Sequence, residues 1–345
     1  MRVRLKPITD QTIVITGGSS GIGLATARAA VRKGAAVVLA ARNGTALDAI
    51  AEELRSSGGR VATCAVDITQ EDAAEQIAGV ARKSFGGFDS WVNAAAVTSY
   101  GSLEQLGMGE HRRVFDVDYF AMLQANLVAL DHLRHRGGGA IINIGSVLSD
   151  RAAIKQPAYC AAKAAVRSLT DSLRMDIERQ GLPISVTLIK PTGIHTPFAE
   201  HARNHMEEPP RIPQIMYDPD LVADAILFAA EHPRRQIYVG GAGITQTLLA
   251  QLFPRLTDRI MELALVRAQQ SPSEPGDPAM RDNLFEPRKD GLEEGTQDFA
   301  VKRWSLSLQA QKHPLAATAI GAAAVLAIGA ALGNRAAPGR REAAD

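Results

Sequence analysis

The stretch Thr12-Ile-Val-Ile-Thr16, followed directly by Gly17-Gly-Ser-Ser-Gly21-Ile-Gly23, decides the fold of this chain. The first part is a short β-branched run that is typical of a buried strand, and an alanine-rich helix is predicted after the glycines. Glycines allow a tight turn and close backbone approach, and the free amides at a helix N-terminus attract phosphate groups. A strand, a glycine loop and a helix start therefore predict nucleotide binding, the alternative being a simple turn.

The rest of the chain alternates between strand and helix patterns. Further strands are predicted over 36–41, 60–66, 90–96, 140–146, 184–190 and 236–239, with helices between them, including one from about 110 to 133. This alternation predicts an α/β fold in which helices cover both faces of a parallel sheet. The site is then expected at the carboxyl ends of the strands.

A second stretch combines three groups that can move a proton. Residues 140–146 are typical of a buried strand that ends on Ser146, and the alanine-rich helix that follows contains Tyr159 and Lys163. Residues four apart lie one turn above each other on the same side of a helix. A hydroxyl, a phenol and an ammonium can thus converge on one point, although a tyrosine four residues before a lysine also occurs by chance.

Residues at the ends of three other predicted strands suit the parts of a dinucleotide. Arg42 follows the second strand and suits a 2′-phosphate, which favours NADP(H) over NAD(H); the alternative is a solvated arginine. Asp67 lies where an adenine edge would bind, or caps the next helix. Asn93 is followed by alanines, 94–96, whose small side chains leave room for a flat ring.

The composition of the chain and the sequence context of its histidines argue against nucleic-acid binding and metal binding. The chain has 38 Lys and Arg against 37 Asp and Glu, so nucleic-acid binding has no electrostatic support. Its two cysteines form no disulfide framework, which suits a reducing compartment. His195, His201 and His205 lack the ligand context of a metal site, so no metal is predicted.

Prolines and mixed charge over 197–217 favour a mobile flap above a pocket.

In their order along the chain, these motifs resemble those of the short-chain dehydrogenase/reductase family. The matching features, over roughly residues 10–245, are Thr16-Gly-Gly-Ser-Ser-Gly-Ile-Gly23, Asp67, Asn93-Ala-Ala-Ala96, Ser146, Tyr159-x-x-x-Lys163, and Pro191-Thr-Gly193 with Thr196. The resemblance implies a Rossmann-type, doubly wound parallel sheet of about seven strands. It also implies an enzyme that transfers a hydride between NADP(H), with NAD(H) as the alternative, and a carbonyl or alcohol.

The resemblance further implies a role for each site residue. Tyr159 is the general acid in reduction and the general base in oxidation, and Lys163 with the oxidised nicotinamide favours its phenolate. Ser146 orients the substrate oxygen, Lys163 binds the nicotinamide ribose, and Ile194 and Thr196 hold the nicotinamide. The implied cofactor contacts are Thr16, Gly17, Ser19, Ser20, Gly21, Ile22, Gly23, Arg42, Asp67, Ile68, Asn93, Ala94, Ala95, Tyr159, Lys163, Pro191, Gly193, Ile194 and Thr196.

Asp118 is the main departure from the family pattern. It stands where an asparagine usually completes the catalytic set, and an ionised aspartate accepts hydrogen bonds but donates none. Because the backbone carbonyl plays much of the asparagine's part, we predict that Asp118 belongs to the catalytic set and that activity survives with an altered pH profile. The alternatives are a plain helix-face residue, or a disabling change that leaves a catalytically weak NADP(H)-binding sensor or scaffold.

Beyond a predicted catalytic domain, 1–255, the chain changes character. Apolar residues at helical spacing over 247–269, interrupted by Pro254, predict two short amphipathic helices that flank the pocket or form a dimer face. Prolines, glycines and charges over 271–295 are typical of a flexible linker, so 256–313 is assigned as helical extension and linker.

The C-terminal part of the sequence predicts a membrane anchor. Residues 315–333 carry no charge, and these 19 residues as a helix would span about 28 Å, close to the ~30 Å core of a bilayer. A transmembrane helix is therefore predicted over 314–334, with a basic tail over 335–345. Flanking basic residues do not choose its orientation, but thiols and nucleotide chemistry favour a cytoplasmic catalytic domain. The expected substrate is a lipophilic alcohol or carbonyl, and a homo-oligomer is expected.

Overall fold

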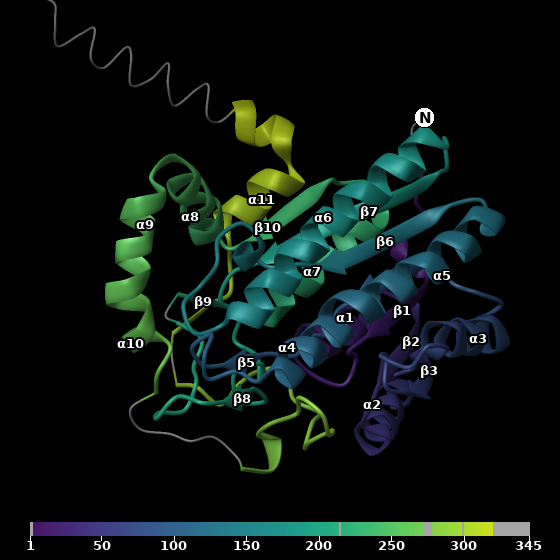
Figure 1. The fold of residues 1–345 in the computed structure, drawn as a ribbon. Coiled ribbons are helices and arrows are strands. Elements are labelled where there is room, and N and C mark those ends of the chain that lie inside the picture. Colours follow the sequence, from purple (N-terminus) through teal and green to yellow (C-terminus); the bar gives the residue numbers. More distant parts are fainter. Residues whose placement is uncertain (1–2, 214, 272–277, 299, 320–345) are drawn as a thin grey trace, which may run out of the picture.

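The computed structural model describes residues 3–213, 215–271, 278–298 and 300–319, which are built around a seven-stranded parallel sheet (Figure 1). The order of the strands is β10-β7-β6-β4-β1-β2-β3. The strands are β1 (Thr12–Thr16), β2 (Ala36–Ala41), β3 (Arg60–Ala65), β4 (Ser90–Asn93), β6 (Gly139–Ile144), β7 (Ile184–Pro191) and β10 (Gln236–Val239). The order reverses at β1 and β4, and open α/β sheets bind ligands at the carboxyl ends beside such a reversal.

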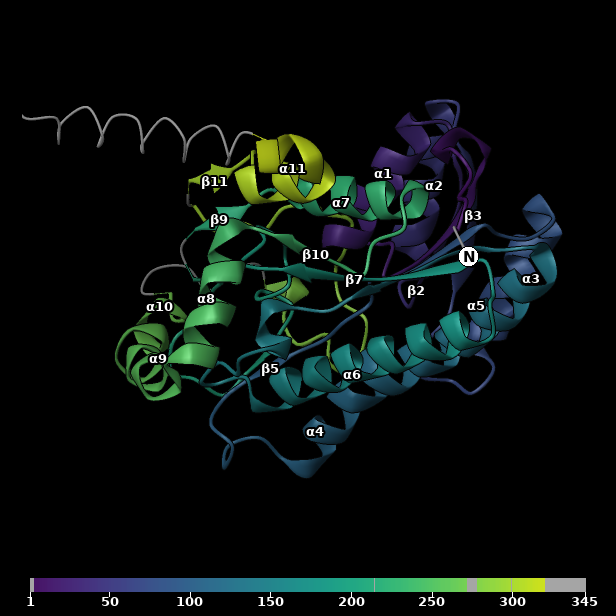
Figure 2. The ribbon, with the colours of Figure 1, turned by 90° about the horizontal axis from the view of Figure 1, so that it is seen from above.

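Successive residues of a strand point to opposite faces of the sheet and belong to two separate hydrophobic cores. In β1, Ile13 and Ile15 belong to one core and Val14 to the other, and all three are fully buried. The helices α1 (Gly21–Arg32), α2 (Gly44–Ser56) and α7 (Pro219–Glu231) cover the first face, and α3 (Ala73–Phe85), α5 (Ala121–Arg136) and α6 (Pro157–Arg179) cover the second (Figure 2). A sheet covered on both faces needs continuous apolar strands. The predicted doubly wound fold is therefore confirmed.

The helix predicted from about residue 110 to 133 is interrupted, which corrects that prediction. α4 (Met108–Phe115) runs into a π-helical turn, Asp116–Phe120, before α5 begins. Such a turn inserts an extra residue into the helix and is common at functional sites. Asp118 lies in this turn and is fully buried.

Short elements connect the carboxyl edge of the sheet with the later part of the chain. β5 (Ser99–Tyr100) pairs with β8 (Arg203–Asn204), and β9 (Met216–Tyr217) pairs with β11 (Val301–Lys302). The predicted flap, 197–217, is thus tied to the domain through β8 and to the later part of the chain through β9. The later helices are α8 (Gly241–Leu252), α9 (Pro254–Ile260), a π-helical turn (Met261–Leu265), α10 (Val266–Ala268) and α11 (Leu306–Lys312). The predicted break at Pro254 separates α8 from α9.

The described part of the segment predicted as a flexible linker contacts the domain at several points. Within it, Met280 and Leu284 are 1% and 0% exposed, and the Gly291 amide donates a hydrogen bond to the Ser19 carbonyl at 3.0 Å. The composition of this segment did not predict these contacts. Two buried side chains and a series of backbone hydrogen bonds hold the segment in place despite its prolines, glycines and charges.

No helix in the described part of the chain is long and apolar enough to cross a membrane. The predicted anchor, 314–334, lies outside the described residues from residue 320 onward.

Candidate active site

The turn between β1 and α1 forms a cradle whose tight points only glycine can occupy. Gly17 has a φ of +70°, and a Cβ added to it would lie 2.7 Å from the Cα of Ala95. A Cβ on Gly23 would lie 2.0 Å from the Gly17 carbonyl oxygen. The loop therefore closes on both α1 and the end of β4, and its glycines place no side chain in the way of a phosphate group.

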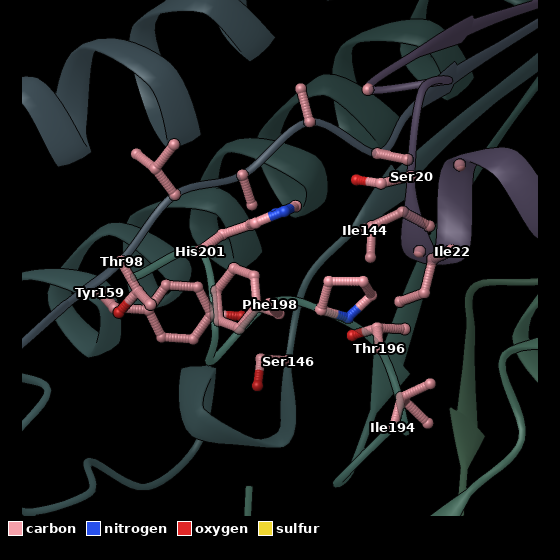
Figure 3. A pocket seen from close by; sticks show the side chains of 18 of the residues that line it. Ser20, Ile22, Thr98, Ile144, Ser146, Tyr159, Ile194, Thr196, Phe198 and His201 are labelled. Atoms are coloured by element: carbon pink, nitrogen blue, oxygen red, sulfur yellow. The ribbon is translucent and has the colours of Figure 1, made fainter. Parts of the chain in front are cut away.

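A cavity of about 380 Å³ runs along this cradle at the carboxyl ends of the strands. In Figure 3, Ser20 and Ile22 lie at one side of it, and Tyr159, Phe198 and Ser146 lie at the other. Most of the predicted site residues line it, namely Gly17, Ser19, Ser20, Gly21, Ile22, Gly23, Arg42, Asp67, Ile68, Ala94, Ala95, Ser146, Tyr159, Lys163, Pro191, Gly193, Ile194 and Thr196. A cavity of this volume falls in the usual range of ligand pockets, about 300–1,000 Å³.

Two predicted cofactor contacts lie behind the cavity wall instead. The Asn93 amide donates hydrogen bonds to the side-chain oxygens of Asn126 and Asn143 at 2.9 and 2.8 Å. The Thr16 hydroxyl is buried and lies 3.5 Å from the Val92 carbonyl, to which it donates. The Thr16 hydroxyl thus ties β1 to β4, and the Asn93 amide ties β4 to α5 and β6. Cofactor contacts at these two positions stay a prediction.

Ser146, Tyr159 and Lys163 meet at one wall of the cavity. Tyr159 and Lys163 lie on α6, and the Lys163 ammonium is 5.5 Å from the centroid of the Tyr159 ring. The same ammonium donates a hydrogen bond to the Ile144 carbonyl at 3.1 Å, which ties it to the end of β6. Ser146 follows this strand, and its hydroxyl accepts a hydrogen bond from the Leu148 amide at 3.1 Å. The structure therefore brings the predicted hydroxyl, phenol and ammonium together.

Asp118 forms a buried ion pair with Lys163. Its Oδ2 lies 3.2 Å from Nζ, and the two side chains are 0% and 1% exposed. Its Oδ1 accepts a hydrogen bond from the Val97 amide at 2.9 Å. Burial raises the pKa of Asp118, and the Lys163 charge opposes that shift. Asp118 therefore contacts the catalytic group through Lys163, and the interpretation as a plain helix-face residue is wrong.

The surroundings of Tyr159 favour its protonated form. Burial raises the pKa of this phenol, the negative charge of Asp118 raises it further, and the nearby Ser146 hydroxyl lowers it. The positive charge of Lys163 was expected to lower the pKa of Tyr159. This effect is offset because the charge is paired with Asp118. At neutral pH the phenol in this arrangement can donate a proton.

Two residues at the adenosine end already have partners. The Arg42 guanidinium donates to the carbonyls of Phe285 and Asn283 at 2.8 and 2.5 Å, and burial lowers its pKa. Since a guanidinium has five N–H donors, others remain for a ligand. Asp67 pairs with Arg113 at 2.7 Å and also lines the cavity, while the residue at the cap position of α3 is Asp72, not Asp67.

Part of the cavity wall comes from residues that no sequence motif marks. Arg288 and Asp290 line the adenosine side, although they lie within the stretch that has the composition of a linker. Phe198 and His201 line the other side, and the Phe198 ring centroid is 5.3 Å from that of Tyr159. The flap prediction over 197–217 could have found the second pair, whereas only tertiary packing reveals the first.

The residues present fit a nicotinamide dinucleotide. The glycine cradle suits a pyrophosphate, and the small Ala94 and Ala95 leave the end of β4 open to a ring. Thr196 and Ile194 lie on the cavity wall where the nicotinamide was expected (Figure 3). The described residues hold no group of three or more His, Cys, Asp or Glu side chains that could bind a metal.

Known proteins share this architecture. The family model described as short chain dehydrogenase matches residues 11–207. The uncharacterized oxidoreductase YxnA of Bacillus subtilis (strain 168) is 39% identical over 326 residues, which cover 94% of this chain and 91% of the relative. L-sorbose reductase from Gluconobacter frateurii, solved with NADPH and L-sorbose, is 25% identical with a TM-score of 0.60, covering 70% of this chain and 98% of the other.

A second solved structure is an alcohol dehydrogenase from the archaeon Thermococcus sibiricus in complex with 5-hydroxy-NADP. It is 25% identical with a TM-score of 0.58, covering 66% of this chain and 95% of the other. The family match spans more than half of the chain, and it includes the glycine cradle, Ser146, Tyr159 and Lys163. The chain therefore belongs to the short-chain dehydrogenase/reductase family, and it is an oxidoreductase that acts with a nicotinamide cofactor.

Proposed function

We propose that this protein transfers a hydride between NADP(H) and a lipophilic carbonyl or alcohol. One observation carries the proposal: Tyr159, Ser146 and the Lys163 ammonium meet at the wall of the cavity that also contains the glycine cradle. A lipophilic substrate is supported by apolar lining residues, namely Val147, Leu148, Phe198, Ile212, Ile215 and Leu265.

The bound nicotinamide supplies a hydride to a carbonyl carbon, or accepts one from an alcohol. In reduction, the Tyr159 hydroxyl donates its proton to the carbonyl oxygen, and Ser146 holds this oxygen while negative charge develops on it. One donor of the Lys163 ammonium meets the Ile144 carbonyl, and the ammonium also pairs with Asp118, so its position beside Tyr159 is fixed. A further donor would bind the nicotinamide ribose.

Turnover tests this function. The full chain with NADPH is offered ketones and aldehydes of increasing apolar length, and the absorbance of the reduced nicotinamide is followed. We expect kcat/KM to rise with apolar length. If no carbonyl is reduced and no alcohol is oxidised although the cofactor binds, the protein is instead the second candidate, a catalytically weak NADP(H)-binding sensor or scaffold. That candidate is favoured by Asp118, whose charge opposes the Tyr159 phenolate.

Replacing Asp118 by asparagine should change the pH profile. Asp118→Asn removes a negative charge that raises the pKa of Tyr159, so this pKa should fall. Alcohol oxidation needs the phenolate, and its rise with pH should therefore begin at a lower pH. Carbonyl reduction needs the phenol, and its alkaline decline should move in the same direction. Profiles of kcat against pH in both directions provide the measurement.

Asp116→Asn is the matched control for this change. Asp116 belongs to the same π-helical turn but is partly exposed, so its substitution should leave both profiles in place. Identical profiles for Asp118→Asn and the wild type would show that the charge of Asp118 does not act on Tyr159.

Replacing Arg42 by aspartate should shift cofactor preference towards NAD(H). We propose that the remaining Arg42 donors bind the 2′-phosphate of NADP(H), and a charge-assisted hydrogen bond contributes about 1.5–3 kcal/mol, so the preference should change at least about tenfold. The measurement is the ratio of kcat/KM for NADPH to that for NADH. Arg60→Asp, at the start of β3 and exposed, should leave this ratio unchanged; an equal ratio in both variants would contradict the role of Arg42.

We also propose that the uncharged residues 315–333 attach the protein to a membrane, with the catalytic domain on the cytoplasmic side. A chain that ends at His313 keeps α11, whose Lys312 pairs with Asp224 at 2.7 Å, so the folded domain stays intact. We expect the full chain to sediment with membranes and to need detergent for extraction, whereas the shortened chain should not. Equal extraction of both without detergent would rule out the anchor.

A further inference from the structure

The C-terminal strap, defined here as residues 278–298, crosses the dinucleotide part of the cavity (yellow-green, at the lower edge of Figure 1). At the adenosine end, two of its carbonyls accept hydrogen bonds from Arg42, and the carbonyl of Arg288 accepts one from the Asn43 amide at 3.0 Å. Arg288 and Asp290 form part of the cavity wall. The strap therefore covers the outer side of the adenosine position.

The strap then binds the glycine-rich loop itself. The Asp290 carboxylate accepts a hydrogen bond from the Ser19 hydroxyl at 2.5 Å. The Gly291 amide donates to the Ser19 carbonyl at 3.0 Å, and the Gly21 amide donates to the Leu292 carbonyl at 2.8 Å. These three bonds lie on the loop whose backbone suits a pyrophosphate.

Past the glycine loop, the strap continues towards the nicotinamide end. The Thr296 amide donates to the Glu200 carboxylate at 2.6 Å, and the Gln297 carbonyl lies 3.0 Å from Nε2 of His195. The strap is also held by an apolar anchor, because Leu284 is fully buried beside Val114 and other residues of one cluster. It is thus attached at both ends of the dinucleotide site and in the middle.

We propose that the C-terminal strap is a gate that retains the cofactor, with Asp290 as its latch on the glycine-rich loop. A dinucleotide on the cradle would lie under a segment attached along its length, so it enters and leaves only when the strap opens. Closure is compatible with a bound cofactor, because the cavity of about 380 Å³ persists beneath the closed strap and Ser20 and Ile22 still line it. This inference rests on the proposed function, since it takes the dinucleotide as the ligand.

A gate has a kinetic signature that a static wall lacks. The strap must open for both entry and release, so a weaker latch should raise both rate constants by the same factor and leave Kd unchanged. In Asp290→Ala we expect the dissociation of NADPH, displaced by excess NADP⁺ and followed by its fluorescence in a stopped-flow instrument, to become about tenfold faster, because the hydrogen bond lost involves a charged group. The association rate constant should rise equally.

Asp298→Ala is the matched control. It removes the same charge from an exposed position of the same strap, so both rate constants should equal those of the wild type. Limited trypsin digestion gives a second readout, because Arg288 and Lys289 lie in the strap next to the latch. NADPH should slow cleavage there in the wild-type full chain, and cleavage should be faster in Asp290→Ala.

Each result separates the alternatives. Unchanged rate constants in Asp290→Ala would make the strap a fixed wall and overturn the gate. Faster association with unchanged dissociation, and hence tighter binding, would make it an inhibitor that competes with the cofactor and would also overturn it. If the wild type binds no nicotinamide dinucleotide at all, the proposed function fails together with the gate. If NADPH binds but turnover is absent, only the catalytic proposal fails.

Discussion

Tyr159→Phe should lower kcat about 10²–10⁴-fold while cofactor binding stays close to that of the wild type, because it removes the only proton that the phenol can give to the substrate oxygen. The ring itself remains, so the contact with Phe198 and the packing above Lys163 are retained. The measurement combines steady-state reduction of the best carbonyl substrate with NADPH titration by fluorescence.

Tyr100→Phe is the matched control for the loss of a phenol. Tyr100 is 2% exposed, lines the same cavity and has a pKa raised by burial, as Tyr159 does. It does not take part in the proposed proton transfer, so its substitution should change kcat little. Equal losses in the two variants, or an unchanged kcat in Tyr159→Phe, would remove Tyr159 from the role of proton donor.

Lys163→Met should destabilise the protein by about 3–5 kcal/mol and abolish turnover, because it leaves the Asp118 carboxylate buried without its partner. Burial raises the pKa of Asp118, and loss of Lys163 removes the charge that opposes this shift. The folded-state pKa of Asp118 is raised in the wild type and should be higher still in Lys163→Met, so the loss of stability relative to the wild type should grow as the pH rises from the first value towards the second. Urea unfolding at about pH 5 and about pH 8 should therefore give the smaller loss at the lower pH.

The double variant Lys163→Met/Asp118→Leu tests the cause. It removes both charges, so it should recover much of the stability at the higher pH without recovering turnover. A double variant as unstable as Lys163→Met would mean that packing around Lys163, rather than the unpaired carboxylate, produces the loss.

Asp118 also shows what a local sequence pattern can predict and what it cannot. Its position in the family motif could be read from the sequence, but its ion pair with Lys163 could not. In the predicted uninterrupted helix, Asp118 would have the position that a regular α-helix gives it. In the structure, Asp118 lies in the π-helical turn over 116–120 and is completely buried. Such a turn has no strong local signature, because it depends on how α4 and α5 pack against α6.

Asn93 has contacts that the sequence did not predict. The motif predicts a cofactor contact there, and in the structure the side-chain amide donates hydrogen bonds to Asn126 and Asn143, which are 33 and 50 residues away in the chain. A sequence motif records that a residue type is required at a position, and it does not distinguish a ligand contact from a buried hydrogen-bond network.

The sequence by itself determined the doubly wound sheet, the glycine cradle, and the placement of Tyr159 and Lys163 one helical turn apart. These features follow from rules that act over a few residues: apolar periodicity, the conformational freedom of glycine and the pitch of a helix. Only the tertiary structure decided that Asp118 neutralises Lys163 and that the C-terminal strap covers the cavity. Ser19 and Asp290 are 271 residues apart, and no local pattern records a contact between segments so distant.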